Sequence, residues 1–191
     1  MLASGNHGKL AEFAELLAPC GIQLFPQAEF GIEPPAEDGA SFVANALLKA
    51  RFAAAGSGLA ALADDSGLEV DALDGSPGVY SARYAGPGAS DAANLRKLLT
   101  ELAGTPLPTP ARFCCVIALV RRADDPAPLL AHGVWEGAII SAARGTAGFG
   151  YDPVFLDPQS GLTAAELSLP QKNARSHRGV ALRALLAQLS A

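Results

Sequence analysis

Cysteine, long apolar runs and basic charge are all scarce in this sequence. Its three cysteines, Cys20, Cys114 and Cys115, include no Cys-x-x-Cys pair, which argues against a disulfide framework and against a zinc site. The longest apolar run, Phe113 to Val120, is too short to cross a bilayer, and the chain turns polar after Ala3, so we expect no signal peptide. The net charge of -5 disfavours nucleic acid or an anionic membrane as partner. We therefore expect a cytoplasmic protein.

What the sequence does contain is typical of a globular α/β protein. Half of its 191 residues are hydrophobic and 17% are charged, which suits one domain spanning residues 1–191. Apolar periodicity predicts helices over 8–17, 41–55, 90–102 and from 176 onward. It predicts strands over 22–25, 59–62, 68–70, 111–121, 129–140 and 154–156, with a hairpin between the fourth and fifth. Strands and helices that mix in this way indicate a mixed β-sheet.

Two adjacent acids, Asp64 and Asp65, follow the apolar run at residues 59–62. We expect them in a turn between two short strands, with Gly67 supplying the bend. Neighbouring side chains on a strand point to opposite faces, so only one of the two carboxylates can enter a given cleft. Buried carboxylates are costly unless a cation, a donor or a reaction uses them. An ordinary solvated turn is the alternative interpretation.

The turn from Ser4 to Lys9 lies between a short strand and the first helix. Its glycines allow a ligand to approach the backbone, the helix N-terminus favours anions, and Lys9 adds a positive charge. It is not a Walker A loop, because two residues separate Gly5 from Gly8 and no Ser or Thr follows Lys9. A phosphate site and a plain glycine-rich turn are both consistent with this pattern.

Three further groups of residues suggest chemistry. Glu37, in an acidic loop, could join Asp65 in holding a divalent cation, although a solvated acidic loop would look the same. The aromatic side chains of 149–152 could stack on a nucleobase or fill the space under a loop. Lys172 and the run 176–178 could bind an anion or a base edge, or could simply cap the last helix.

Taken together and in order, these motifs resemble the inosine triphosphate pyrophosphatase family. The motifs are Ser-Gly-Asn-x-Gly-Lys from Ser4, Glu37, Asp-Asp-Ser-Gly-Leu from Asp64, Gly-x-Tyr-Ser-Ala-Arg-Tyr from Gly78, Gly-Phe-Gly-Tyr-Asp-Pro from Gly148, and Ser-His-Arg from Ser176. The resemblance covers essentially the whole chain. It implies an α/β fold with an elongated mixed β-sheet between two α/β lobes, a homodimer and dependence on Mg²⁺. Relatives usually carry several more residues before the first motif, so we expect a short first strand.

The resemblance also implies a role for each matching residue. Asp65 would be the general base and, with Glu37, a metal ligand. The triphosphate would lie against Ser4, Gly5, Asn6, His7, Gly8 and Lys9, with added charge from Lys49 and Lys172, and Ser66 would contact the substrate. The base would be held by Phe149, Gly150, Tyr151, Asp152, His177 and Arg178.

The implied reaction is Mg²⁺-dependent attack of water on the α-phosphorus of ITP, dITP or XTP, releasing pyrophosphate and the nucleoside monophosphate. A pyrophosphatase for modified pyrimidine nucleotides on a related fold is the nearest alternative. A regulatory module that senses nucleotides without hydrolysing them is another, although Glu37 and Asp65 would then have little purpose beside a polyanion.

Overall fold

The computed structural model describes residues 1–190, which divide into two compact units. Unit 1 comprises Met1–Asp65, Cys115–Gly133 and the chain from His177 onward, and unit 2 comprises Ser66–Cys114 and Val134–Ser176. Within residues 1–190, no helix combines the length and the apolar character needed to span a membrane.

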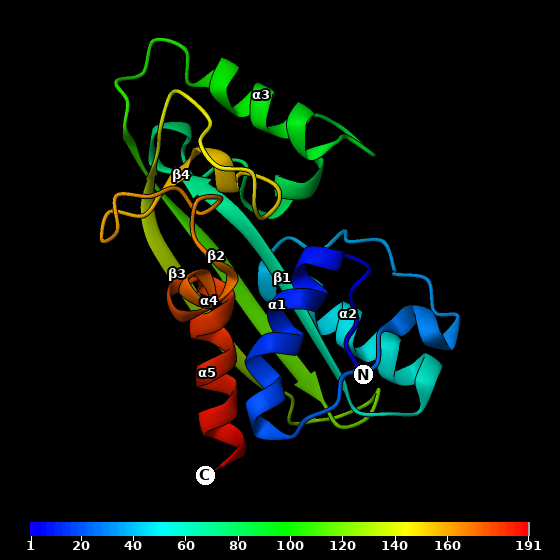
Figure 1. The fold of residues 1–191 in the computed structure, drawn as a ribbon. Helices are drawn as coiled ribbons and strands as arrows, with labels where there is room; N and C mark the ends of the chain where they lie inside the picture. The colour runs from blue at the N-terminus through cyan, green and yellow to red at the C-terminus, as the bar shows by residue number, and fades with distance from the viewer. Residues whose placement is uncertain (191) are drawn as a thin grey trace. The chain divides into compact units, whose positions relative to one another are not determined.

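One four-stranded sheet carries the fold, in the order β1-β2-β3-β4 (Figure 1). Its strands are β1 (Ala61–Val70), β2 (Thr109–Val120), β3 (Leu129–Ile139) and β4 (Phe155–Leu156). β3 and β4 pair antiparallel, whereas Leu2 forms single parallel bridges with Pro26 and Leu62. The predicted α/β class with mixed pairing is therefore confirmed, and so is the short first strand, which is reduced to a bridge.

Three helices cover the two faces of the sheet within unit 1: α1 (His7–Leu17), α2 (Phe42–Ser57) and α5 (His177–Leu189). Because side chains alternate along a strand, Leu62 joins the core formed with α1 and α5, whereas Ala61 and Ala63 join the core against α2. The α2 core is built mainly from alanines, which let the helix approach the sheet closely. Figure 1 shows α1 and α5 side by side.

Unit 2 has its own core, centred on three aromatic rings. Phe113 lies 4.4 Å from Phe155 between ring centroids, and Trp135 lies 5.0 Å from Phe155. The helices of this unit are α3 (Asp91–Glu101), capped by Ser90, and α4 (Leu169–Arg175), which begins with a capping box formed by Ser168 and Gln171. Short 3₁₀ segments complete the chain: η1 (Ala18–Cys20) and η2 (Gln27–Phe30) in unit 1, and η3 (Asp71–Leu73), η4 (Gly78–Arg83) and η5 (Asp152–Val154) in unit 2.

Two of the predicted elements are wrong. Residues 22–25 form no strand, since only a single bridge at Pro26 marks that region. The predicted turn at Asp64 and Asp65 is absent, because β1 continues without a break from Ala61 to Val70. The strand can continue through two buried acids because Lys9 and Arg178 pair with Asp64, while Lys49 and Asn45 bind Asp65.

Candidate functional site

Asp65 lies buried in β1 and faces two residues of helix α2. Its Oδ1 is 2.9 Å from the Lys49 ammonium, and its Oδ2 accepts a hydrogen bond of 3.0 Å from the Asn45 amide. The same ammonium lies 2.7 Å from Oε1 of Glu37, which comes from the loop before α2. Unit 1 thus brings together three of the predicted site residues, Glu37, Lys49 and Asp65.

The surroundings of Asp65 change its proton affinity. Burial raises the pKa of the Asp65 carboxyl above its usual value, although the nearby Lys49 charge opposes that rise. Burial also opposes the charge of Lys49, but three carboxylates, those of Asp64, Asp65 and Glu37, outweigh it and raise the pKa of the lysine. A carboxyl group of raised pKa is a stronger base than an ordinary carboxylate, which suits the predicted role of Asp65 as proton acceptor.

Asp64 points to the opposite face of β1, toward α1 and α5. Its Oδ2 lies 2.9 Å from Lys9 Nζ and accepts a 3.2 Å hydrogen bond from Nε of Arg178. Arg178 is fully buried, and its guanidinium also pairs with Glu12. Burial would raise the pKa of Asp64, but the charges of Lys9, Arg178 and Lys49 hold that pKa far below its usual range. Asp64 is therefore held in its charged form, whereas burial shifts the pKa of Asp65 in the opposite direction.

The turn before α1 caps that helix with its own side chains. Asn6 is the N-cap and accepts a 3.0 Å hydrogen bond from the Lys9 backbone, and the Asn6 backbone donates to the Ser4 hydroxyl at 3.2 Å. A methyl group placed on Gly5 would meet nothing within 4 Å, so one side of the turn is open. His7, the first helical residue, is exposed, and Gly8 follows it in the first turn. An open glycine at the N-terminus of a helix is compatible with the predicted phosphate contact.

Glu37 and Asp65 are the predicted ligands of a divalent cation, and the chemistry of their side chains is compatible with that role. Both offer hard oxygen donors, and the Lys49 ammonium already holds a positive charge between them. Within residues 1–190, no cluster of three or more His, Cys, Asp or Glu side chains could hold a metal ion. Mg²⁺ commonly takes one or two carboxylates and completes its shell with water and substrate phosphates, so two ligands are sufficient.

In unit 2, the predicted base-binding loop is held by Asp152 and Lys172. The buried Asp152 accepts a 2.9 Å hydrogen bond from the Phe149 backbone and lies 2.6 Å from Nζ of Lys172 in α4. That ammonium also lies 4.8 Å from the centre of the Phe149 ring. The structure therefore brings Phe149, Asp152 and Lys172 together, with a cation over an aromatic face.

The two residues between Phe149 and Asp152 are fixed from other parts of unit 2. The Gly150 backbone donates a 2.8 Å hydrogen bond to Asp91, the first residue of α3, and the Tyr151 hydroxyl donates at 2.9 Å to the Ser81 carbonyl. Ser66 is half-buried in β1 and belongs to unit 2, whereas His177 is buried at the start of α5 in unit 1. The substrate contacts of these residues stay predictions.

Three residues of these networks escaped the sequence analysis: Asn45, Glu12 and Asp91. Asn45 had a detectable signal, because it lies four residues before Lys49 and so shares its helix face. Glu12 resembles an ordinary polar position of an amphipathic helix, because its partner Arg178 is distant in the sequence. Asp91 looks like a favourable acid in the first turn of a helix.

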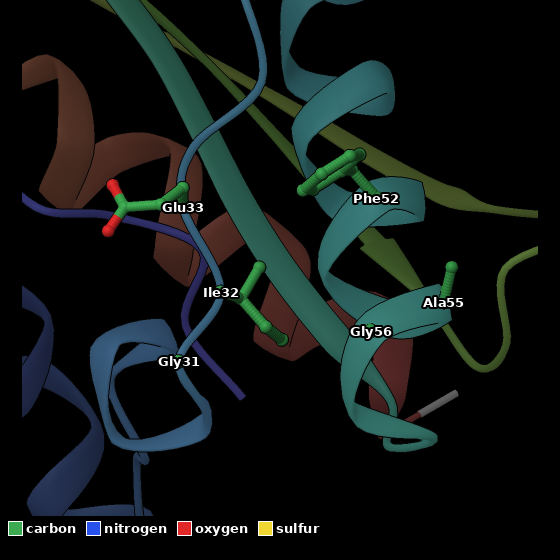
Figure 2. Close-up of a pocket in the computed structure, with 6 residues that line it drawn as sticks. All are labelled: Gly31, Ile32, Glu33, Phe52, Ala55 and Gly56. Atoms are coloured by element: carbon green, nitrogen blue, oxygen red, sulfur yellow. The ribbon is translucent and has the colours of Figure 1, made fainter.

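A separate pocket of about 490 Å³ lies in unit 1 between the loop at 31–33 and the C-terminal half of α2 (Figure 2). It is lined by Gly31, Ile32, Glu33, Phe52, Ala55 and Gly56. Ile32 and Phe52 give it a largely apolar wall, and none of the predicted site residues borders it. Its chemistry does not resemble a binding site for a triphosphate, which requires donors and cations.

Comparison with known proteins agrees with the motifs. The model of the Ham1 family matches residues 1–188. A dITP/XTP pyrophosphatase of Thioalkalivibrio sulfidiphilus is 58% identical over 99% of this chain and 97% of its own length. The solved structure of a HAM1 protein from Coxiella burnetii matches with a TM-score of 0.89 at 52% identity, over 99% of this chain and 96% of that one. The Staphylococcus aureus Ham1 protein matches with a TM-score of 0.85 at 40% identity, over the same shares of the two chains. The resemblance drawn from the motifs is confirmed, and the chain belongs to the Ham1 family.

Proposed function

We propose that this chain hydrolyses the non-standard purine nucleoside triphosphates ITP, dITP and XTP to the monophosphate and pyrophosphate. The observation that carries the proposal is Asp65, a buried carboxylate held by Asn45 and Lys49 with Glu37 on the same ammonium. Relatives named dITP/XTP pyrophosphatase, at 50–58% identity over nearly the whole chain, supply the substrate class.

In the proposed mechanism, Asp65 accepts the proton of the water that attacks the α-phosphorus. The bond from that phosphorus to its bridging oxygen breaks, and pyrophosphate leaves. Bound Mg²⁺, held by Glu37 and Asp65, would neutralise phosphate charge. Lys9, which pairs with Asp64, and Lys49, which pairs with Glu37 and Asp65, would add positive charge for the phosphates, while the open turn at Gly5 offers backbone N–H groups.

We assign base recognition to Phe149–Asp152 of unit 2 and to His177 and Arg178 of unit 1, and we assign Lys172, like Lys49, to the charge of the triphosphate. The Phe149 ring offers a face for stacking, which would suit any purine. Selectivity would come from donors aimed at position six, where hypoxanthine and xanthine carry an acceptor oxygen. Adenine carries an amino group there, and a donor that faces another donor leaves both unpaired and costs affinity.

The decisive experiment is a pyrophosphate-release assay with Mg²⁺ and a panel of nucleotides. We expect turnover of ITP, dITP and XTP, and little turnover of GTP or ATP. Turnover of ATP comparable to that of ITP would contradict the base selectivity. Preferential turnover of dUTP or of methylated pyrimidine nucleotides would favour the pyrimidine alternative. Calorimetric binding of ITP without pyrophosphate release would favour a sensing module.

A variant of the proposed base tests the mechanism. Asp65→Asn keeps the size of the side chain and removes its proton affinity, so we expect a loss of about 10²–10⁴-fold in kcat. Asp125→Asn is the matched control, since Asp125 is another buried acid of unit 1, and its carboxylate accepts hydrogen bonds from the Arg121 and Ala127 backbones. Equal activity in the two variants would remove Asp65 from the catalytic role.

We further propose that the chain works as a homodimer in the cytoplasm. Its three cysteines are free thiols, which suits a reducing compartment. Light scattering of the purified protein should give twice the 19.4 kDa of one chain. A mass of one chain at micromolar concentration would contradict the dimer without affecting the proposed chemistry.

A further inference from the structure

Asn45 links the proposed base to the loop that carries Glu37. It lies fully buried in α2, and its amide forms a hydrogen bond at each end. Its Oδ1 accepts a 2.8 Å hydrogen bond from the backbone of Gly39, two residues after Glu37. Its Nδ2 donates to Oδ2 of Asp65 at 3.0 Å. Neither contact involves the substrate directly.

The orientation of this amide follows from its partners. A backbone N–H can only donate, so the oxygen of Asn45 must face Gly39 and its NH₂ must face Asp65. Lys49, one helical turn later, holds the other oxygen of Asp65. Each carboxylate oxygen therefore has a donor from α2, and the carboxylate cannot rotate without losing one of these bonds.

Gly39 is part of the same arrangement. A methyl group placed on Gly39 would collide with Oδ1 of Asn45 and would lie 3.1 Å from its Cγ. Only a residue without a side chain lets the loop come this close to the amide. A displacement of the loop therefore displaces Asn45 as well. Because Asn45 donates to Asp65, the displacement also changes the position of the Asp65 carboxylate.

We infer that Asn45 is a positioning residue, which orients the Asp65 carboxylate for proton acceptance and ties the Glu37 loop to it through Gly39. This inference rests on the proposed function, because it assigns a partner to the base of that reaction. Misplacement of a reacting group by about 1 Å can lower the rate about 10²-fold. Loss of the buried amide that fixes the Asp65 carboxylate can therefore lower kcat by a similar factor.

The test compares Asn45→Asp with the matched variant Asn94→Asp. Asn45→Asp keeps the acceptor for Gly39 but replaces the donor with an oxygen that faces Asp65. Asn94 is also buried, and its amide links α3 to the backbone of Ala82 and Ala85 without touching a carboxylate. We expect kcat for ITP to fall about 10²-fold in Asn45→Asp with KM within about threefold, and to stay within about twofold in Asn94→Asp.

Three further variants separate positioning from folding. Gly39→Ala disturbs the link from the loop side and should lower kcat about tenfold or more at an unchanged melting temperature. In an Asp65→Asn background, Asn45→Asp should produce no additional loss, because Asn45 acts only through Asp65. Hydrogen exchange of the peptide covering residues 37–41 should accelerate in Asn45→Ala, which is a readout independent of activity.

The outcomes distinguish this inference from the proposed function. A wild-type protein that releases no pyrophosphate from ITP would overturn the function. An active wild type with equal losses in Asn45→Asp and Asn94→Asp, or with additive losses in the double variant, would overturn the positioning role and leave the function standing. If the Asn45→Asp protein fails to fold, the Gly39→Ala variant becomes the test. A normal kcat in Gly39→Ala would then overturn the inference.

Discussion

At the scale of single residues, two adjacent aspartates differ because their surroundings differ. Asp65 has one ammonium and one amide, and burial raises its pKa, whereas Asp64 has two cations in contact and keeps its charge. The first arrangement leaves a group that can take up a proton. The second fixes α1 and α5 to the sheet through Lys9 and Arg178. Asp65 is thus the proposed catalytic residue, whereas its neighbour Asp64 stabilises the fold.

This division predicts that Asp64→Asn damages the fold more than Asp65→Asn does. The substitution leaves the half-buried Lys9 facing a neutral amide and removes one of the two acids that pair with the buried Arg178, the other being Glu12. Breaking a buried ion pair typically costs about 3–5 kcal/mol. Urea denaturation of the two variants measures the difference. Equal midpoints would show that Asp64 contributes no more to stability than its neighbour.

The thiols provide a second prediction, which concerns pH. Burial and the nearby Glu69 raise the pKa of the Cys114 thiol to about 12, and burial raises that of Cys115, while Cys20 is exposed. The thiolate is the reactive form, so at pH 8 Cys114 stays almost entirely in the unreactive thiol form. Iodoacetamide at pH 8 should therefore modify Cys20 first, and Cys114 should react faster as the pH rises toward 12.

Peptide mapping by mass spectrometry measures these reactions. The same treatment in denaturant is the control, and all three cysteines should then react. Modification of Cys114 as fast as Cys20 in the native protein at pH 8 would contradict the environment described for β2.

At the scale of elements, the contact between β3 and α5 depends on a glycine. A methyl group placed on Gly133 would collide with the backbone carbonyl of His177 and lie 2.5 Å from the backbone nitrogen of Ala181. Backbone atoms cannot move aside as a flexible side chain can. The close packing of this helix on its strand therefore requires the absence of a side chain at Gly133.

We predict that Gly133→Ala lowers the free energy of unfolding by about 1–3 kcal/mol, the usual cost of overpacking. Gly5→Ala is the control for stability, since a methyl group there meets nothing within 4 Å. Thermal denaturation of both variants provides the comparison. A Gly133→Ala protein as stable as the control would mean that α5 can shift away from β3 at little cost.

Elements with strong local signals could be predicted from the sequence. Ser41 and Ser90 cap α2 and α3 as expected, and the hairpin of β2 and β3 follows its apolar pattern. β1 could not be predicted correctly, because two aspartates look like a turn unless their partners are known. Those partners come from α1, α2 and α5, more than ten residues away in the sequence, and local pattern carries no information about them.

At the scale of the whole molecule, the described residues form two units, each with a hydrophobic core of its own, and the two units share strands. β1, β2 and β3 each contribute residues to both units, with boundaries after Asp65, Cys114 and Gly133. Each of these strands is continuous across the boundary between the units. Unfolding of one unit therefore also disrupts part of the strand pairing in the other unit. Small domains linked in this way are expected to unfold together.

We therefore predict a single unfolding transition. Trp135, the only tryptophan of the chain, reports on the core of unit 2 through its fluorescence, while far-UV circular dichroism reports largely on α1, α2 and α5 of unit 1. Urea midpoints from the two signals should coincide. Midpoints that differ by more than experimental error would show that the units unfold independently.

The candidate site illustrates what the sequence could and could not predict. The order of the motifs along the chain was sufficient to predict the family, whereas the roles of the individual site residues stay predictions. The pairing of Arg178 with Asp64 and Glu12 was not predictable, since it joins residues 114 and 166 positions apart. Two buried acids, Asp64 and Glu12, already bind the Arg178 guanidinium. These ion pairs count against the prediction that Arg178 contacts the base.

The opposite orientation of Asp64 and Asp65 has a consequence for changes in chain length. Since side chains alternate with a period of two, one residue inserted or deleted between Ala61 and Asp64 would move every later side chain of β1 to the other face. The carboxylate of Asp65, which binds Lys49, would then face Lys9 and Arg178, although the amino-acid composition of the strand would hardly change. In this part of the gene, a deletion of a single codon should therefore be more harmful than most substitutions of the same codon.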